Sequence, residues 1–291
     1  MTVESQVYKT AKNGLTRGER EPRIAILVLG CLLTVYDRCI KTIRATWGSQ
    51  SVDNVDIFYV YGAQHATTSD EIVAIEDLIG QAPPQLQDFE VWASDDVILC
   101  GATDVREGQE NCILRKRLIA FDYLANKQGY DFIYTVCATS YVDVERLRQY
   151  VRTLPFTGVY HGPLAVDGAG GYPFVSGASL LLSKDIAADL ANHATTIILT
   201  YPESLPDDVV FGHWIATKYA NEPVAEISSR IASEQKPTNN ETFVMPNGQA
   251  IINFVVTPEY SHMPQEKAFH YHFHSRRMWE MENFHRRFFA A

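Results

Sequence analysis

Three continuous apolar runs, separated by helical patterns, limit what the first half of this chain can fold into. The runs cover residues 23–30, 55–62 and 131–136, and apart from Arg23, Asp56 and Asp131 they carry no charge, which is typical of strands buried on both faces. Helical spacing of apolar residues fills the intervals, most clearly over 110–127. Strands that alternate with helices predict an α/β fold with a central mixed, mainly parallel sheet flanked by helices.

Weaker patterns complete the expected order of elements. Helices are expected over 34–47, 68–79 and 143–151, and short strands over 89–92, 224–227 and 250–256. The chain has 291 residues, with no internal repeat and no linker long enough to divide it. We therefore expect one domain over residues 22–291, with halves of about 22–150 and 151–291, preceded by a flexible arm over 1–21.

Charge and cysteine content exclude several classes of protein. Lys and Arg number 25 against 35 Asp and Glu, and the formal net charge of −10 argues against non-specific nucleic-acid binding. Five cysteines, an odd number without C-x-x-C spacing, indicate neither a disulfide framework nor a zinc site. No stretch reaches the roughly 18 apolar residues of a membrane span, and the N-terminus lacks the apolar core of a signal peptide. We expect a cytoplasmic protein that binds no nucleic acid, and the sequence indicates no oligomeric state.

The segment Leu205-Pro206-Asp207-Asp208 places two adjacent carboxylates at the predicted start of a helix. Proline is tolerated in a first helical turn, and the positive end of the helix dipole favours negative charge there. One interpretation is a helix N-terminus with two solvated acids. The other is a general base at the mouth of a cleft. The segment alone leaves both interpretations open.

Six short segments occur along the chain in the order of a known family. They are Arg38 with Ile43-Arg44-Ala45-Thr46-Trp47-Gly48, residues 55–62, Asn111-Cys112-Ile113-Leu114-Arg115, Phe174-Val175-Ser176-Gly177-Ala178, Leu205-Pro206-Asp207-Asp208-Val209, and Phe269-His270-Tyr271-His272. Together they resemble the fringe and β1,3-glycosyltransferase group, whose members are inverting enzymes of the GT-A fold. The resemblance implies a GT-A-like domain with a nucleotide-binding first half and an acceptor-binding second half.

The resemblance also implies a reaction and a set of site residues. A sugar would move from a nucleotide diphosphate sugar, with UDP favoured and GDP possible, to a hydroxyl of a glycan acceptor. Asp208 would be the general base, Asp207 would support it or bind the acceptor, and Ser176, Gly177 and Trp214 would contact the acceptor. The residues expected at the donor are Cys31, Arg38, Arg44, Arg115, Cys137, Thr139, His270, His272 and Arg276.

One departure from the family affects the metal. Family members carry two or three aspartates after the strand that here covers 131–136, and these hold Mn²⁺ against the donor diphosphate. This sequence has Cys137-Ala138-Thr139 at that position. Because Mn²⁺ is a hard cation that prefers carboxylate oxygens, we expect no metal site, although Mn²⁺ use stays possible. Fixed cations, Arg115, Lys116 and the His270–Arg276 segment among them, would then offset the diphosphate charge.

Two other functions remain open from the sequence. Loss of the acidic motif is also what a catalytically inactive glycan- or nucleotide-binding relative would show. A redox enzyme with a dinucleotide cofactor is less favoured, because no G-x-G-x-x-G follows the first predicted strand. The expected absence of a membrane anchor points to a bacterial or viral enzyme of the cytosol, or to an excised catalytic domain.

Overall fold

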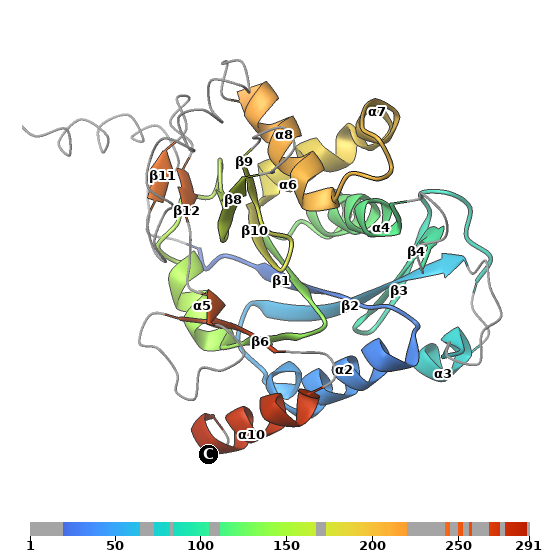
Figure 1. The fold of residues 1–291 in the computed structure, drawn as a ribbon, viewed down its shortest axis with the longest axis vertical. Helices are drawn as coiled ribbons and strands as arrows, with labels where there is room; N and C mark the ends of the chain where they lie inside the picture. The colour runs from blue at the N-terminus through green and yellow to red at the C-terminus, as the bar shows by residue number, and fades with distance from the viewer. Residues whose placement is uncertain are drawn as a thin grey trace, which may run out of the picture.

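The structure is a computed structural model, and it describes ten segments of the chain (Figure 1). They are residues 20–64, 73–81, 84–104, 111–166, 173–219, 242–244, 250–252, 256–257, 268–273 and 277–289. Most of the predicted arm, the start of the predicted helix over 68–79 and the predicted strand over 224–227 lie outside them. Among the described residues, no helix is long and apolar enough to cross a membrane.

A mixed, mainly parallel sheet forms the centre of the described part of the molecule. Its order is β3-β4-β2-β1-β5-β10-β7. The neighbours β4, β2, β1 and β5 are parallel, whereas β3 and β10 run antiparallel to the strands beside them. The strands are β1 (Ile24–Leu29), β2 (Val55–Gln64), β3 (Val91–Ser94), β4 (Val97–Thr103), β5 (Phe132–Cys137), β7 (Tyr160–His161) and β10 (Ser179–Ser183).

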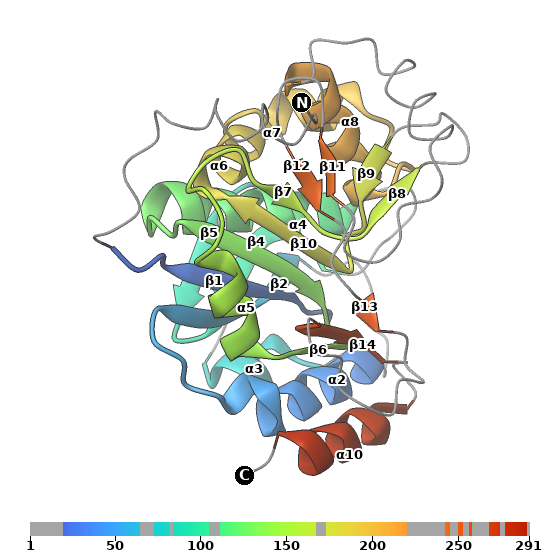
Figure 2. The same ribbon diagram turned by 90° about the vertical axis from the view of Figure 1, so that its left-hand side faces the viewer.

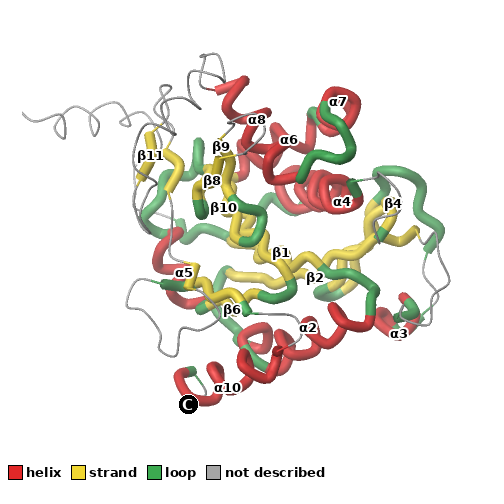
Figure 3. Tube along the Cα trace, viewed as in Figure 1, coloured by secondary structure: helices red, strands yellow, loops and turns green. Residues whose placement is uncertain are grey.

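Helices cover both faces of this sheet (Figures 1 and 3). One face carries α2 (Thr34–Ala45) and α10 (Met278–Phe288), with the short η1 (Trp47–Ser49) and α3 (Ile75–Ile79) nearby. The other carries α4 (Cys112–Phe121), which continues into the π-helical η2 (Asp122–Lys127), then α6 (Lys184–Asn192), α7 (Ala194–Thr200) and α8 (Asp207–Tyr219). The remaining helix described is α5 (Val144–Val151).

The alternation of side chains along β1 explains why both faces need helices. Ile24, Ile26 and Val28 belong to the core on the α2 and α10 side, while Ala25 and Leu27 belong to the core under α4 and α6. All five are completely buried. A strand with apolar residues on both faces is stable only when both faces are covered, so the continuous apolar run dictates the layered arrangement.

A smaller sheet lies beside α10 (Figure 2). It contains β13 (Val256–Thr257), β14 (His270–His272) and β6 (Ser140–Val142), with β14 in the middle. The Trp47 indole donates to the carbonyl of Ser140 at 2.8 Å, which fixes the turn between β5 and β6 against the end of α2. Two separate hairpins join β8 (Leu164–Val166) with β9 (Pro173–Val175), and β11 (Thr242–Val244) with β12 (Ala250–Ile252).

The predicted α/β class, as a single domain with a mixed, mainly parallel sheet between helices, is confirmed and is consistent with a GT-A-like fold. No strand was expected at β4, β6, β7, β8, β11 or β14, and β3 begins two residues later than the predicted strand over 89–92. Asp143, expected at a helix start, is the N-cap of α5, where its side chain accepts from the backbone N–H of Arg146 at 3.1 Å. The division into a nucleotide-binding and an acceptor-binding half stays a prediction.

Candidate active site

The ends of the parallel strands meet at one edge of the main sheet. β1 is followed by Cys31, β4 is followed by Asp104, and β5 ends at Cys137. β10 begins at the same edge, because Ser179 pairs with Val136 in the antiparallel register. Ligands of open α/β sheets bind outside the carboxyl ends of the strands. We call this edge, together with the start of α8, the candidate site.

A buried ion pair joins the ends of three strands at this edge. The Asp104 carboxylate accepts from the backbone N–H groups of Leu32 at 2.6 Å and Gly62 at 2.8 Å. Lys116 Nζ donates to Asp104 Oδ1 at 3.1 Å and to the Gly30 carbonyl at 2.9 Å. Burial acts to lower the pKa of Lys116, but the charge of Asp104, together with Cys112, Cys31 and the hydrogen bond to Asp104, raises it overall. Lys116 is therefore a charged structural residue, and the expectation that it offsets a diphosphate is wrong.

Asp207 is the first residue of α8 and is held by Arg117 of α4. Arg117 Nη1 donates to Asp207 Oδ2, and Arg117 Nη2 donates to the Gly177 carbonyl at 2.5 Å. Burial raises the pKa of Asp207, the positive charge of Arg117 lowers it, and the nearby charge of Asp208 raises it further. Because arginine keeps its proton in proteins, Asp207 is committed to this ion pair rather than available as a base.

Asp208 is the half-buried member of the carboxylate pair. Its Oδ2 accepts from the backbone N–H of Gly177 at 2.8 Å, and its Oδ1 accepts from the N–H of Val209 at 2.9 Å. A Cβ at Gly177 would lie 2.8 Å from Arg117 Nη1 and 3.3 Å from Asp208 Cβ, so a larger residue there would displace one of them. Each carboxylate oxygen accepts one described bond and retains a further lone pair. Asp208 is thus positioned by backbone groups while still able to accept a proton.

Cys137, Thr139 and His272 lie together at the end of β5, where the fringe-like resemblance predicts aspartates. Cys137 Sγ is 3.1 Å from Thr139 Oγ1 and 3.2 Å from Ser140 Oγ. Thr139 Oγ1 is 2.7 Å from His272 Nε2. The antiparallel register of β14 and β6 pairs His272 with Ser140, which brings the C-terminal segment to this turn. The structure therefore brings three of the predicted donor residues into one cluster.

The residues of this cluster do not fit Mn²⁺. They offer a thiol, two hydroxyls and an imidazole, whereas a hard divalent cation is held chiefly by carboxylate and carbonyl oxygens. Within the described part of the chain, no group of three or more His, Cys, Asp and Glu side chains is placed to hold a metal ion. Independence from metal stays a prediction.

His270 differs from His272 in its surroundings. It is completely buried, and its Nδ1 lies 2.6 Å from the Tyr134 hydroxyl, which is also 2.7 Å from Ser179 Oγ. Burial, with a smaller contribution from the charge of His272, lowers the pKa of His270 to about 3. A neutral, enclosed imidazole offers no positive charge to a diphosphate, so its surroundings do not favour the electrostatic role of His270, which stays a prediction.

The burial of His270 predicts a pH dependence of stability. Its pKa rises from about 3 in the folded state to an ordinary value near 6.5 on unfolding, so the unfolded chain binds the extra proton between these values. Stability is therefore full above pH 6.5 and is lost as the pH falls. We expect the wild type to lose about 2 kcal/mol more than His270→Gln between pH 7 and pH 5 in urea unfolding. Equal losses in the two proteins would contradict the buried neutral state.

Two predicted donor residues of α2 lie at opposite ends of that helix. Arg38 is exposed near the start of α2, which follows the carboxyl end of β1. Arg44 is in the last turn, where it pairs with Asp96 at 2.7 Å and stacks over the Tyr59 ring at 4.2 Å. Asp96 immediately precedes β4, so Arg44 lies at the amino ends of the strands. The structure keeps Arg38 as a candidate and separates Arg44 from the site.

Other predicted contacts are also separated from Asp208. Arg115 lies over the ring of Phe89, 6.0 Å from its centroid, on the β3 and β4 side of the edge. Trp214 donates from its indole to Asp189 of α6 at 3.2 Å, so it packs between helices and not beside the acceptor candidates Ser176 and Gly177. Arg276 lies outside the described residues.

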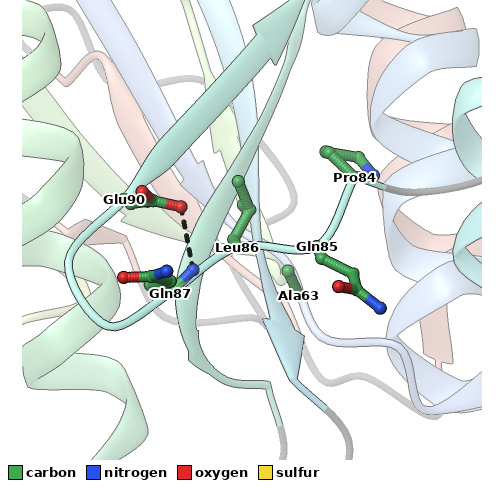
Figure 4. Close-up of a pocket in the computed structure, with 6 residues that line it drawn as sticks. All are labelled: Ala63, Pro84, Gln85, Leu86, Gln87 and Glu90. Atoms are coloured by element: carbon green, nitrogen blue, oxygen red, sulfur yellow. Dashed lines mark hydrogen bonds between the residues drawn. The ribbon is translucent and has the colours of Figure 1, made fainter.

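An open pocket of about 660 Å³ lies beside the loop that precedes β3 (Figure 4). Phe89, whose ring lies under Arg115, belongs to the same loop. Its lining residues are Ala63, Pro84, Gln85, Leu86, Gln87 and Glu90. The backbone N–H of Gln87 donates to Glu90 Oε2 at 2.9 Å between two of these lining residues. Because β2 and β10 are separated by β1 and β5, this pocket is distinct from the surroundings of Asp208.

Comparison with known proteins gives distant similarity to solved structures. No protein-family model matches the chain, and no curated protein matches it. Among solved structures, the chain is similar to the glycosyltransferase GlyE of Streptococcus pneumoniae TIGR4, with 11% sequence identity and a TM-score of 0.37. The match covers 90% of this chain and 60% of the GlyE chain. A TM-score of 0.37 is too low to establish a shared fold, so the fringe-like resemblance stays a prediction.

Arg117 and Asp104 are residues of the candidate site that were not predicted from the sequence. Arg117 belongs to the basic cluster of α4, but periodicity alone does not say which of three consecutive cations faces α8. Asp104 could have been found, because it directly follows the apolar run Val97–Thr103, and an acid after a buried strand lies at the carboxyl edge of the sheet.

Proposed function

We propose that this protein is a glycosyltransferase that moves a sugar, with inversion, from a nucleotide diphosphate sugar to a hydroxyl of a glycan acceptor. One observation supports the proposal above all. Of two adjacent carboxylates at the start of α8, Asp207 is neutralised by Arg117, while Asp208 is fixed by backbone N–H groups and retains lone pairs for a proton. Asp207 is therefore a structural carboxylate, and Asp208 is the carboxylate available as a base.

The proposed reaction needs one base and compensation for a leaving anion. Asp208 takes the proton of the acceptor hydroxyl as its oxygen bonds to the anomeric carbon, and the bond to the diphosphate breaks on the opposite face. The neighbouring Ser176 and Gly177 would line the acceptor position. Positive charge for the leaving diphosphate would come from Arg38 near the end of β1, and His272 beside the end of β5 would donate a hydrogen bond to it.

We expect turnover to persist in EDTA, because the residues at the end of β5 are poor ligands for Mn²⁺. Thermal unfolding with UDP, GDP and their sugars, each with Mn²⁺ and with EDTA, would show the donor and any need for metal, since a ligand that binds the folded state raises Tm. Turnover of the best donor is then measured in both conditions. A strict requirement for Mn²⁺ would contradict the prediction.

The replacement of the family's acids by Cys137-Ala138-Thr139 also favours a second candidate, a binding protein without catalytic activity. The same experiment separates the two functions. A nucleotide sugar that raises Tm but gives no product with any glycan acceptor, with or without metal, would favour the binding protein and leave Asp208 as a residue of the helix start.

A further inference from the structure

The sulfur of Cys137, at the edge of the main sheet, is surrounded by polar groups that take no part in the proposed proton transfer to Asp208. Cys137 ends β5, with the hydroxyls of Thr139 and Ser140 at 3.1 and 3.2 Å from its Sγ. The imidazole of His272 bonds to Thr139 at 2.7 Å and is also a hydrogen-bond partner of the thiol. The main sheet holds Cys137, and the register of β14 and β6 in the small sheet fixes His272 beside the same turn.

The electrostatics of this cluster favour the thiolate. Burial acts to raise the pKa of Cys137, but hydrogen bonding to His272, its positive charge, and the hydroxyls of Ser140 and Thr139 together lower the pKa to about 7. Burial and nearby thiols, Cys137 included, raise the pKa values of Cys39 and Tyr36 on α2. These neighbours therefore stay protonated at neutral pH and do not compete with Cys137 for the imidazole.

The other cysteines provide an internal comparison. Cys39, Cys100 and Cys112 are buried, whereas Cys31 is half-buried like Cys137. Burial and the charge of Asp104 raise the pKa of Cys31 to about 11. Cys31 follows β1, the strand beside β5, so the two thiols lie at the same edge of one sheet. They differ mainly in the group that each faces, a carboxylate for Cys31 and an imidazole for Cys137.

We propose that Cys137 is a site of reversible modification by low-molecular-weight disulfides, with His272 as its positioning and charge-stabilising partner. The Cys137 thiolate attacks one sulfur of the disulfide and forms a new S–S bond, while the S–S bond of the reagent breaks. The second sulfur leaves as a thiolate that takes a proton from His272 or from water. The products are a mixed disulfide at Cys137 and one free thiol, so no further oxidant is needed. This reactivity does not depend on the proposed glycosyl transfer.

The first test compares two thiols within the same folded protein. The full chain is treated with glutathione disulfide at pH 7, and the modified fraction of each cysteine is followed by peptide mass spectrometry. At pH 7 a much larger fraction of Cys137 than of Cys31 is thiolate. The Cys31 thiolate is more basic and therefore more nucleophilic, which offsets part of that difference. We expect Cys137 to react roughly a hundredfold faster than Cys31. A dithiol reductant is expected to reverse the modification.

The second test identifies the partner of the thiol. In the wild type, the rate at Cys137 against pH should have its midpoint near 7. In His272→Gln we expect the midpoint to move to the ordinary range of a cysteine, about 8.5 or above, with a roughly fivefold slower reaction at pH 7 and no change at Cys31. A wild-type Cys137 that reacts no faster than Cys31, or a midpoint that His272→Gln leaves in place, would overturn the proposal.

Discussion

Replacing Asp208 with Asn is expected to lower kcat by about a hundredfold or more while leaving donor binding almost unchanged. The amide has nearly the shape of the carboxylate but cannot accept the acceptor's proton. Its oxygen can still accept one of the two backbone bonds that now come from Gly177 and Val209. Turnover is measured with the donor found by thermal unfolding, and donor affinity is measured from the rise in Tm.

A matched control separates catalysis from the stability of the helix start. Asp77 is an exposed carboxylate in the first turn of α3, so Asp77→Asn removes a favourable helix-dipole charge away from the site. We expect it to leave kcat unchanged and to alter stability by no more than about 1 kcal/mol. An Asp208→Asn variant that turns over as fast as Asp77→Asn would make Asp208 a structural residue.

Breaking the Arg117–Asp207 pair is expected to destabilise the fold more than any change to a surface ion pair. Arg117→Met leaves the Asp207 carboxylate buried without its cation, and removal of one partner from a buried pair costs about 3–5 kcal/mol. The Arg117 side chain is 2% exposed and also donates to the Gly177 carbonyl, so neither group regains water on truncation. The free energy of unfolding in urea measures the effect, with the slope m checked for constancy.

Two further variants show whether the loss comes from the pair. Lys127→Met breaks the exposed pair with Asp122, and we expect it to cost at most about 1 kcal/mol. The double variant Arg117→Met/Asp207→Leu removes both charges, and we expect a smaller loss than the sum of the single changes. If Arg117→Met cost as little as Lys127→Met, the pair would not hold the start of α8.

The layered fold was predictable from sequence because its strands are buried on both faces. The segments that form β1 and β5 are continuous apolar runs, and Asp56 is the single charged residue in β2, so all three strands can be recognised without knowledge of distant contacts. The small sheet was not predictable in the same way. β6 and β14 are three residues each and are stable only because pairing and the aromatic residues of α10 bring them together.

Side-chain direction limited the prediction of the site. The sequence identified a basic cluster on α4, but its three cations face different partners: Arg115 lies over Phe89, Lys116 binds Asp104, and Arg117 binds Asp207. On a helix, consecutive residues point about 100° apart, so only the packing decides which cation faces the site.

Burial limited the prediction for the C-terminal histidines. The alternation of a strand sends His270 and His272 to the same face of β14, which favours equal roles. In the structure, His270 is completely enclosed with Tyr134, whereas His272 is half-buried beside Thr139. The two histidines therefore differ in their surroundings because of neighbours from β5 and the β5–β6 turn, which no spacing rule within the segment reveals.

The anomeric configuration of the product tests the central claim most directly. The donor identified by thermal unfolding is incubated with the protein and a glycan acceptor, and proton NMR follows the anomeric signals of donor and product from the first minutes. With Asp208 as the base on the face opposite the leaving diphosphate, we expect a product of inverted configuration in the wild type and almost none in Asp208→Asn. A product that retains the donor's configuration would contradict this account.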